Sequence, residues 1–399
     1  MSSEVTLSAA TRQNLLSLQD TAALTSQTQN RLATGKKVSS ALDNPVNFFT
    51  AQSLSNRSSD LGTLLDSISN GVQTIQAANQ GLTSIQKLVD SAKSTANQAL
   101  STQITTSGTA KTAFAAPGSA TTVTLYVNGT STTASIASTD SIDTAITKLN
   151  TAVSGLGAGT AFSKNTAGTN LVVNASADIE FAATTDQAAL GFSQGSAAAA
   201  KYGAASAAGQ SADLTVTGVK ERTALAAQYN SLLTQIDQLA KDASFNGVNL
   251  INSSSVNNKL HIAFNERDTS NLDIQGVDAT SGGLSLTAIT GNSGASTNGQ
   301  GNFLLDTDIK STLTSLTNAS STLRSNASTF GSNLSVVQNR QDFTKNIINV
   351  LQTGSSNLTD ADLNEEAANS QALTTRQSLG ISALSLANQA QQGILQLLR

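Results

Sequence analysis

Side chains that perform catalysis or bind metals are scarce in this chain of 399 residues. The chain has no cysteine, and His261 is its only histidine. The lack of cysteine excludes a disulfide framework, a thiolate zinc site and a cysteine nucleophile. A single histidine cannot form a two-histidine metal site and disfavours a Ser/His/Asp triad. We expect His261 to be a surface or strand residue with no chemical role.

Four acidic residues near the C-terminus, Asp360, Asp362, Glu365 and Glu366, could be read as metal ligands. They fit the start of a helix better, because the helix dipole favours negative charge in the first turn. Thr359 stands three residues before Asp362, which is the spacing of an N-cap residue and its partner. We therefore expect Thr359 to cap a helix, and we expect no metal, no cofactor and no enzyme activity.

Composition narrows the class of protein further. Charged residues make up 12% of the chain and the formal net charge is −4, which argues against a nucleic-acid partner. No apolar run reaches the roughly 18 residues of a membrane span, and the start of the chain lacks the apolar core of a signal peptide. We therefore expect no membrane partner and no cleavable signal. Ser, Thr, Asn and Gln together number 167 and Ala 57, so small and polar residues dominate.

The elements that organise these residues are helices with heptad repeats. Between residues 46 and 101 the apolar positions follow alternating spacings of three and four, which predicts a long coiled-coil helix. Leu64, Ala78 and Ile85 add a second stripe, so this helix should face more than one partner. The main seam consists of Leu54, Leu61, Leu65, Ile68, Val72, Ile75, Leu82 and Val89.

Heptads also occupy both ends of the chain. The first helical block runs from Ser3 to about Leu42, with polar Thr25 and Gln29 interrupting its seam, and Pro45 should start the next helix. Such polar-rich seams are weak alone, so we expect the two ends to pair with each other and with copies in neighbouring subunits. The terminal seam positions are Leu15, Leu18, Ala22 and Leu32, and Leu379, Ala383, Leu386, Ala390 and Leu397.

The middle of the chain has a different pattern. Alternation over residues 122–127 followed by Asn-Gly predicts a β-hairpin, residues 141–153 read as an amphipathic helix, and 171–173 and 179–181 read as strands. These features predict a small α+β domain, followed by a linker at about 195–211. A helix seam at residues 225–239, an Asn246-Gly247 turn and a helix over about 309–351 come next. The expected strands between them are 260–264, 272–274 and 284–286.

Three segments carry a family resemblance. RLATGKKVSSALDNP (Arg31–Pro45), DASFNGVNL (Asp242–Leu250) and ALSLANQAQQGILQLLR (Ala383–Arg399) resemble bacterial flagellin. The insert resembles the flagellin hook IN motif through VTLYVNGTS, DSIDTAITKLNTA and TNLVVNASADIEFAATTDQAALGF.

The resemblance implies a mainly α fold, in which long antiparallel coiled-coil helices from both termini carry a small inserted α+β outer domain and a short β segment. The innermost domain, D0, would comprise residues 1–44 and 359–399. D1 would comprise 45–106 and 209–358, and the insert 107–208. The best-known flagellins place their outer domains after the SFNG-type turn, whereas the insert here precedes it.

The implied function is that of a structural subunit, which is exported and polymerises into the extracellular flagellar filament for motility. Its implied partners are other copies of itself, an export chaperone and the export apparatus, and the hook-associated junction and cap proteins. The seams given above would then be shared between subunits. Two alternatives stay open: a hook–filament junction protein, and a flagellin-like surface adhesin or ligand-binding protein that acts through the insert.

The resemblance also bears on immune recognition. In many flagellins a Toll-like receptor reads a surface patch on D1, which matches residues 82–88 here. The key arginine of the family falls on Ser84, the neighbouring acidic residue on Lys87 and a second acidic contact on Gln228, while a leucine is retained as Leu88. Losing the arginine removes a hot-spot anchor with several donors, so weak recognition is expected.

Overall fold

The computed structural model describes residues 9–196, 208–289 and 303–397, and it is mainly helical as expected. The described residues form two compact units. Unit 1 contains the described parts of residues 1–69, 262–272 and 338–399, and unit 2 those of 70–261 and 273–337. The helices α2 (Pro45–Ser101) and α6 (Asp306–Thr359) have residues in both units. Within the described residues, no helix is both long and apolar enough to cross a membrane.

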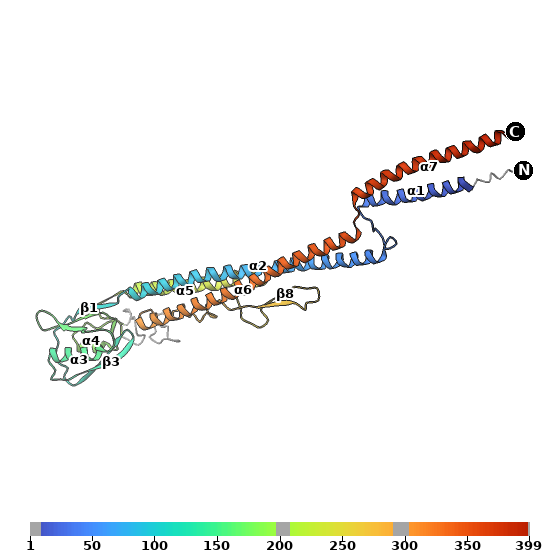
Figure 1. Ribbon diagram of the computed structural model, residues 1–399. Coiled ribbons are helices and arrows are strands. Elements are labelled where there is room, and N and C mark those ends of the chain that lie inside the picture. The colour runs from blue at the N-terminus through green and yellow to red at the C-terminus, as the bar shows by residue number, and fades with distance from the viewer. Residues whose placement is uncertain (1–8, 197–207, 290–302, 398–399) are drawn as a thin grey trace. The chain divides into compact units, whose positions relative to one another are not determined.

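Unit 1 joins the two ends of the chain. The helices α1 (Ala9–Thr34) and α7 (Leu363–Leu397) lie side by side (Figure 1). They run antiparallel, because Arg31 near the end of α1 pairs with Glu366 near the start of α7. The predicted pairing of the two terminal helices is therefore present within a single chain.

The helix boundaries around the first junction follow from local chemistry. Gly35, with φ at +69°, ends α1, as glycine commonly does at a helix C-terminus. The first helix is thus shorter than the predicted run to Leu42. Pro45 starts α2, and the side chain of Asn44 accepts a hydrogen bond from Asn47 N at 3.1 Å. The predicted break before Pro45 is confirmed.

The predicted cap at the second junction is wrong. Thr359 is the last residue of α6, and its hydroxyl donates to Ser355 O at 3.0 Å. Asp362 is the cap of α7 instead, because its Oδ1 accepts from Asn364 N at 2.9 Å and from Glu365 N at 3.3 Å. Both Thr and Asp are common cap residues, so the sequence alone does not show which of Thr359 and Asp362 caps the helix.

Within each unit α2 and α6 run antiparallel. In unit 1 Gln341 donates to the Ser69 hydroxyl at 2.8 Å, and Ser355 donates to the Ala51 carbonyl at 3.2 Å. In unit 2 the side chain of Gln86 donates to the Ser320 hydroxyl at 2.9 Å. These contacts agree with the predicted antiparallel coiled-coil helices.

Unit 2 adds α5 (Val219–Asp242) to the pair of long helices, and a buried arginine lies where α5 begins. Arg222 donates to Thr102 O at 2.7 Å, and to Phe303 O and Leu304 O at 3.2 and 3.1 Å. It also pairs with Asp306 at 2.8 Å. Its side chain thereby satisfies carbonyls just after α2 and just before α6, which are groups that need partners at this depth.

The insert is an α+β domain with two small sheets. One has the strand order β4-β5-β1-β7 and the other β3-β2-β6, and both are built from antiparallel pairs. Buried Thr106 connects them, because its hydroxyl donates to Ala177 O and accepts from Ile179 N. The elements are β1 (Thr105–Thr109), β2 (Thr121–Val127), β3 (Thr130–Ile136), α3 (Ile142–Ser154), β4 (Phe162–Lys164), β5 (Leu171–Ala175), β6 (Ile179–Phe181), α4 (Thr184–Ala189) and β7 (Leu214–Thr217).

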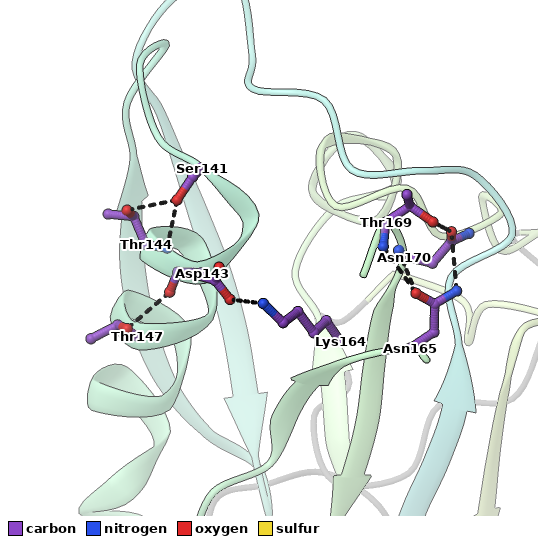
Figure 2. A network of polar contacts seen from close by, with 8 residues as sticks. All are labelled: Ser141, Asp143, Thr144, Thr147, Lys164, Asn165, Thr169 and Asn170. Atoms are coloured by element: carbon purple, nitrogen blue, oxygen red, sulfur yellow. Dashed lines mark hydrogen bonds and ion pairs between the residues drawn. The ribbon is translucent and has the colours of Figure 1, made fainter. Parts of the chain in front are cut away.

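The predicted helix and hairpin of the insert are confirmed. Figure 2 shows Ser141 capping α3, where its hydroxyl accepts from Thr144 N at 3.2 Å. Asp143 in the first turn reaches Lys164 on β4 at 2.7 Å. The Asn-Gly pair at 128–129 adopts positive φ at both residues, which is the requirement of a type I′ hairpin turn.

The short β segment of the helical region is smaller than predicted. The strands β8 (Lys259–Ala263) and β9 (Asn271–Gln275) pair with each other. Residues 284–286 are a turn and not a strand, because Leu286 N donates to Ser281 O and Ser285 has a φ of +56°. Leu284 and Leu286 are both buried. Their spacing of two residues therefore reflects burial in a turn and not a strand.

Two glycines of α2 provide a matched test of its packing. A Cβ on Gly81 would lie 2.6 Å from Ala243 Cβ and 2.7 Å from Ile251 Cδ1, whereas a Cβ on Gly62 would meet nothing within 4 Å. We expect Gly81→Ala to lower the free energy of unfolding by about 1 kcal/mol, because an overpacking cost of about 1–3 kcal/mol exceeds a propensity gain of about 1 kcal/mol. Gly62→Ala should raise it by up to about 1 kcal/mol. Denaturant titration of both variants checks the contrast, and equal shifts would contradict it.

Candidate assembly surfaces of the terminal helices

The described residues contain no cluster of three or more potential metal ligands. His261 lies on β8, as a strand residue was predicted to, and its Nδ1 is 2.5 Å from Asp273 on β9. Lys259 approaches the same carboxylate at 2.9 Å. Hydrogen bonds from Lys259 and His261 lower the pKa of Asp273. This is a cross-strand charge group on an exposed hairpin.

The contact between α1 and α7 combines small and polar residues with a few half-buried leucines. Leu18 packs against Gly380 so closely that a Cβ there would lie 2.7 Å from Leu18 Cδ1. The hydroxyls of Thr21 and Thr25 bond to carbonyls of their own helix at 2.7 Å, so these side chains can face a partner helix with their oxygens satisfied. The less exposed positions on α7 repeat every three and four residues, and they are Glu366, Ser370, Leu373, Gln377, Gly380, Leu384 and Ala387.

The predicted terminal seams lie mostly on other faces. Leu18 is half-buried, but Leu15, Ala22 and Leu32 are exposed. The predicted seam positions Leu379, Ala383, Leu386 and Ala390 on α7 are all exposed. Leu379 and Leu386 keep 65% and 69% of their surface. The side chain of Leu397 lies outside the described ones. Of the described positions, only Leu18 therefore contributes to the pairing of the two ends within one chain, and the exposed ones stay predicted polymerisation positions.

Exposed apolar side chains are concentrated in unit 1. Among the large apolar side chains that are most exposed in the described residues, all except Val256 and Val336 belong to this unit. Monomeric proteins seldom leave many such side chains open on one region. The members in unit 1 are Leu15, Leu16, Leu24, Leu32, Leu42, Val46, Phe49, Phe343, Val350, Leu363, Leu379, Ile381 and Leu386.

The predicted seam of α2 is buried within the single chain. Ile68 and Ile75 have no exposed surface, and Leu54 and Leu65 are half-buried. The remaining members, Leu61, Val72, Leu82 and Val89, are buried. Ala78 and Ile85 of the second stripe are also buried, so α2 does face more than one neighbour.

The segment DASFNGVNL forms a tight turn after α5. Asn246 and Gly247 have φ of +49° and +79°, and Phe245 and Val248 exchange backbone hydrogen bonds around them. Asn249 then donates through Nδ2 to the carbonyls of Ala240 and Lys241 at 2.7 and 2.9 Å. The sequence predicted the turn but not this cap, which the asparagine two residues after the Asn-Gly pair could have suggested.

The four positions that correspond to the receptor patch lie on two helices of unit 2. Lys87 on α2 and Gln228 on α5 are exposed, whereas Ser84 and Leu88 on α2 are half-buried. These positions therefore present a small hydroxyl, a lysine and an amide where the resemblance predicts an arginine and two acids.

One ion pair fixes the register of α1 against α7. Arg31 Nη1 lies 3.1 Å from Glu366 Oε1, and the Glu366 side chain is only 9% exposed. We expect Arg31→Met to weaken this pairing by about 1–2 kcal/mol, because it leaves a buried carboxylate without its partner. The measurement is amide hydrogen exchange in α1 and α7. The double variant Arg31→Met/Glu366→Gln removes the charge and should recover part of the protection; faster exchange than in the single variant would contradict this.

Comparison with known proteins matches both ends of the chain. Residues 5–116 match the bacterial flagellin N-terminal helical region, and residues 313–398 match the bacterial flagellin C-terminal helical region. Flagellin FljM of Caulobacter vibrioides is 35% identical over 176 residues, which cover 44% of this chain and 59% of that protein. Flagellin C of Rhizobium meliloti is 40% identical over 77 residues, which cover 19% of this chain and 24% of that protein.

The chain thus spans about three fifths of the length of the Caulobacter flagellins that it matches. The two family regions contain α1 and the whole of α2 at one end, and most of α6 together with α7 at the other. Because both terminal helical regions are present in one chain, this protein belongs to the bacterial flagellin family.

Proposed function

We propose that the protein is a structural subunit that polymerises with copies of itself into the bacterial flagellar filament, outside the cell, for motility. The observation that carries this proposal is the open apolar surface of unit 1, which includes Leu15, Leu24, Leu379 and Leu386. Fully burying one such side chain is worth about 1.5–3 kcal/mol. A homopolymer buries the same surface in every copy, so many individually weak contacts together can stabilise the filament.

The domain roles follow the family pattern. Residues 1–44 and 359–399 form the inner domain D0, 45–104 and 218–358 form D1, and the insert, with its hook IN-like segments, is the outer domain. Because β7 pairs with β1, we extend the insert from the expected 107–208 to 105–217. Its export partners are a chaperone and the flagellar export apparatus, and its neighbours at the filament ends are the hook-associated junction and cap proteins. Sparse charge and the lack of cysteine suit a chain that is exported unfolded.

Electron microscopy of the purified protein after a salt-induced polymerisation trial tests the proposal. Long helical filaments are expected, and a protein that stays monomeric under every tested condition would refute it. The alternative of a hook–filament junction protein predicts a single ring per flagellum in place of thousands of copies. Counting copies per flagellum by quantitative mass spectrometry separates the two roles.

The receptor-patch positions lead to a further prediction within this function. The resemblance puts an arginine at Ser84 and acidic residues at Lys87 and Gln228, and none of these is present here. The patch therefore lacks the arginine, whose several donors make it a strong binding contact. We expect this flagellin to be at least tenfold less potent than an enteric flagellin in a reporter assay for the Toll-like receptor. Ser84→Arg should raise its potency, and a native potency equal to the enteric protein would overturn the prediction.

A further inference from the structure

Two short connections join the α1–α7 pair to α2 and α6. One comprises residues 35–44, and the other comprises residues 360–362, because α6 ends at Thr359 and α7 begins at Leu363. All of these residues belong to unit 1. The shorter connection is an elbow between two long helices. Whatever fixes the direction of the terminal pair must therefore act on these two segments.

The two connections are paired with each other through their backbones. Lys37 N donates to Thr359 O at 2.8 Å, and Val38 N donates to the same oxygen at 3.2 Å. In the opposite sense, Ala361 N donates to Gly35 O at 2.9 Å. These three bonds join the connections into a short antiparallel pair of segments. We call the two paired segments the ladder.

Ordered structure continues on both sides of the ladder. Val38 is only 6% exposed, so its side chain anchors the longer connection. Asp43 closes the turn that follows, because its Oδ2 accepts from the N–H groups of Ser39 and Ser40, both at 2.9 Å. On the side of the terminal helices, the ion pair between α1 and α7 follows. The ladder is therefore tied to its surroundings at both ends.

Both helix pairs that meet at the ladder carry exposed apolar side chains. Leu24 and Leu379 lie on the terminal pair, and Phe49 and Phe343 lie on α2 and α6. A neighbouring copy that covers both sets at once must meet them in one relative direction. An unsupported elbow would let that direction vary, and ordering it on binding would cost entropy. Bending the supported elbow instead requires breaking backbone hydrogen bonds.

We propose that the ladder is a brace that keeps the α1–α7 pair in one direction relative to the adjoining ends of α2 and α6, and that the braced chain is the state that polymerises. The inference rests on the proposed function, since it names the conformation in which the subunit joins the filament. A chain with an open ladder has to close it before it can be added. The fraction of closed chains then sets the apparent affinity for the filament end.

Removal of one backbone donor tests whether assembly needs the ladder. Lys37→Pro eliminates the N–H that bonds to Thr359 O, whereas Lys37→Ala loses the same charge and keeps the N–H. Lys36 lies in a β-bridge, and an extended backbone suits a residue before proline. We expect Lys37→Pro to raise the critical concentration for polymerisation at least tenfold over Lys37→Ala, with unchanged helical content in circular dichroism. Equal critical concentrations would overturn the inference.

A disulfide across the ladder separates an open ladder from other damage. Lys36 and Asp360 form an antiparallel bridge, and the hydrogen bonds flank this pair, so their Cα atoms should lie about 4.5 Å apart, which a disulfide can span. The chain has no native cysteine, and Lys36→Cys/Asp360→Cys leaves the net charge unchanged. We expect the oxidised pair to polymerise as its reduced form does. In the Lys37→Pro background, oxidation should restore the critical concentration to within about threefold of the Lys37→Ala value.

The outcomes separate this inference from the function on which it rests. If the cysteine pair does not oxidise, or if its oxidised form fails to polymerise while the reduced form succeeds, the closed ladder is not the assembling state. If Lys37→Pro stays impaired after oxidation, an open ladder is not the cause of its defect. Each of these results would overturn the brace and leave the filament role intact. Failure of the unmodified protein to polymerise would overturn the proposed function together with this inference.

Discussion

Ile75→Asp is expected to unfold much of unit 2 and to abolish filament formation. Ile75 lies on α2 with no exposed surface, so the variant places a charge in a packed apolar core. The cost of several kcal/mol is comparable to the whole stability of a domain, about 5–15 kcal/mol. Circular dichroism of the free chain checks the result, and Ile75→Val, which should cost only about 0.5–1.5 kcal/mol, is the control.

Leu65→Asp should also abolish filaments, but by a different route. Leu65 is half-buried, so an aspartate there can keep part of its hydration in the free chain. We expect this variant to remain folded and to fail only in assembly. Motile cells that carry either Ile75→Asp or Leu65→Asp as their sole flagellin would contradict the role of the α2 seam.

Leu379→Asp/Leu386→Asp is expected to leave the free chain folded and to eliminate polymerisation. Both leucines are about two-thirds exposed on α7, and substitutions at such positions usually change stability by less than about 0.5 kcal/mol. In a polymer that covers this face, every copy would bury two carboxylates without partners. Sedimentation after salt treatment measures the loss.

The matched control for this pair is Leu379→Met/Leu386→Met, which keeps the face apolar and similar in volume. It should sediment like the unmodified protein. If the aspartate variant polymerises at the same critical concentration as the methionine variant, α7 does not present this face to other copies.

The sequence predicted long helices well, because their signals are local or strictly periodic. Asn44 and Pro45 mark the start of α2 by capping and by a fixed φ, and the seam from Leu61 to Val89 keeps its heptad spacing through both units. Ser141 and the Asn-Gly pair of the insert are equally local signals. Elements of this kind need no knowledge of their neighbours.

The sequence did not show which terminal positions pair within one chain, for a physical reason. The apolar positions of α7, such as Leu379, indicate which face avoids water but not which partner covers it. The contact with α1 depends on close approach at Gly380, and small residues carry no hydrophobic signal. In a polymer the strongest apolar stripe can belong to contacts between chains, which a single chain does not display.

Several elements of the insert were missed because pairing over long distances creates them. The strands β1 and β7 are rich in threonine and lack an apolar run, and they pair across more than a hundred residues, as Thr105 does with Thr217. Arg222 likewise gave no signal in the sequence, since its role depends on carbonyls contributed by two segments that lie about two hundred residues apart, at Thr102 and at Phe303 and Leu304.

Amide hydrogen exchange of the free chain and of the sedimented polymer tests whether copies of the chain cover the open apolar faces of α1 and α7. In the free chain these two helices should exchange faster than α2 and be cut by proteases, because their outer apolar faces are open to water. Strong protection of both helices is expected in the polymer. Equal exchange in the two states would show that other copies do not cover these faces, and it would contradict the proposed assembly.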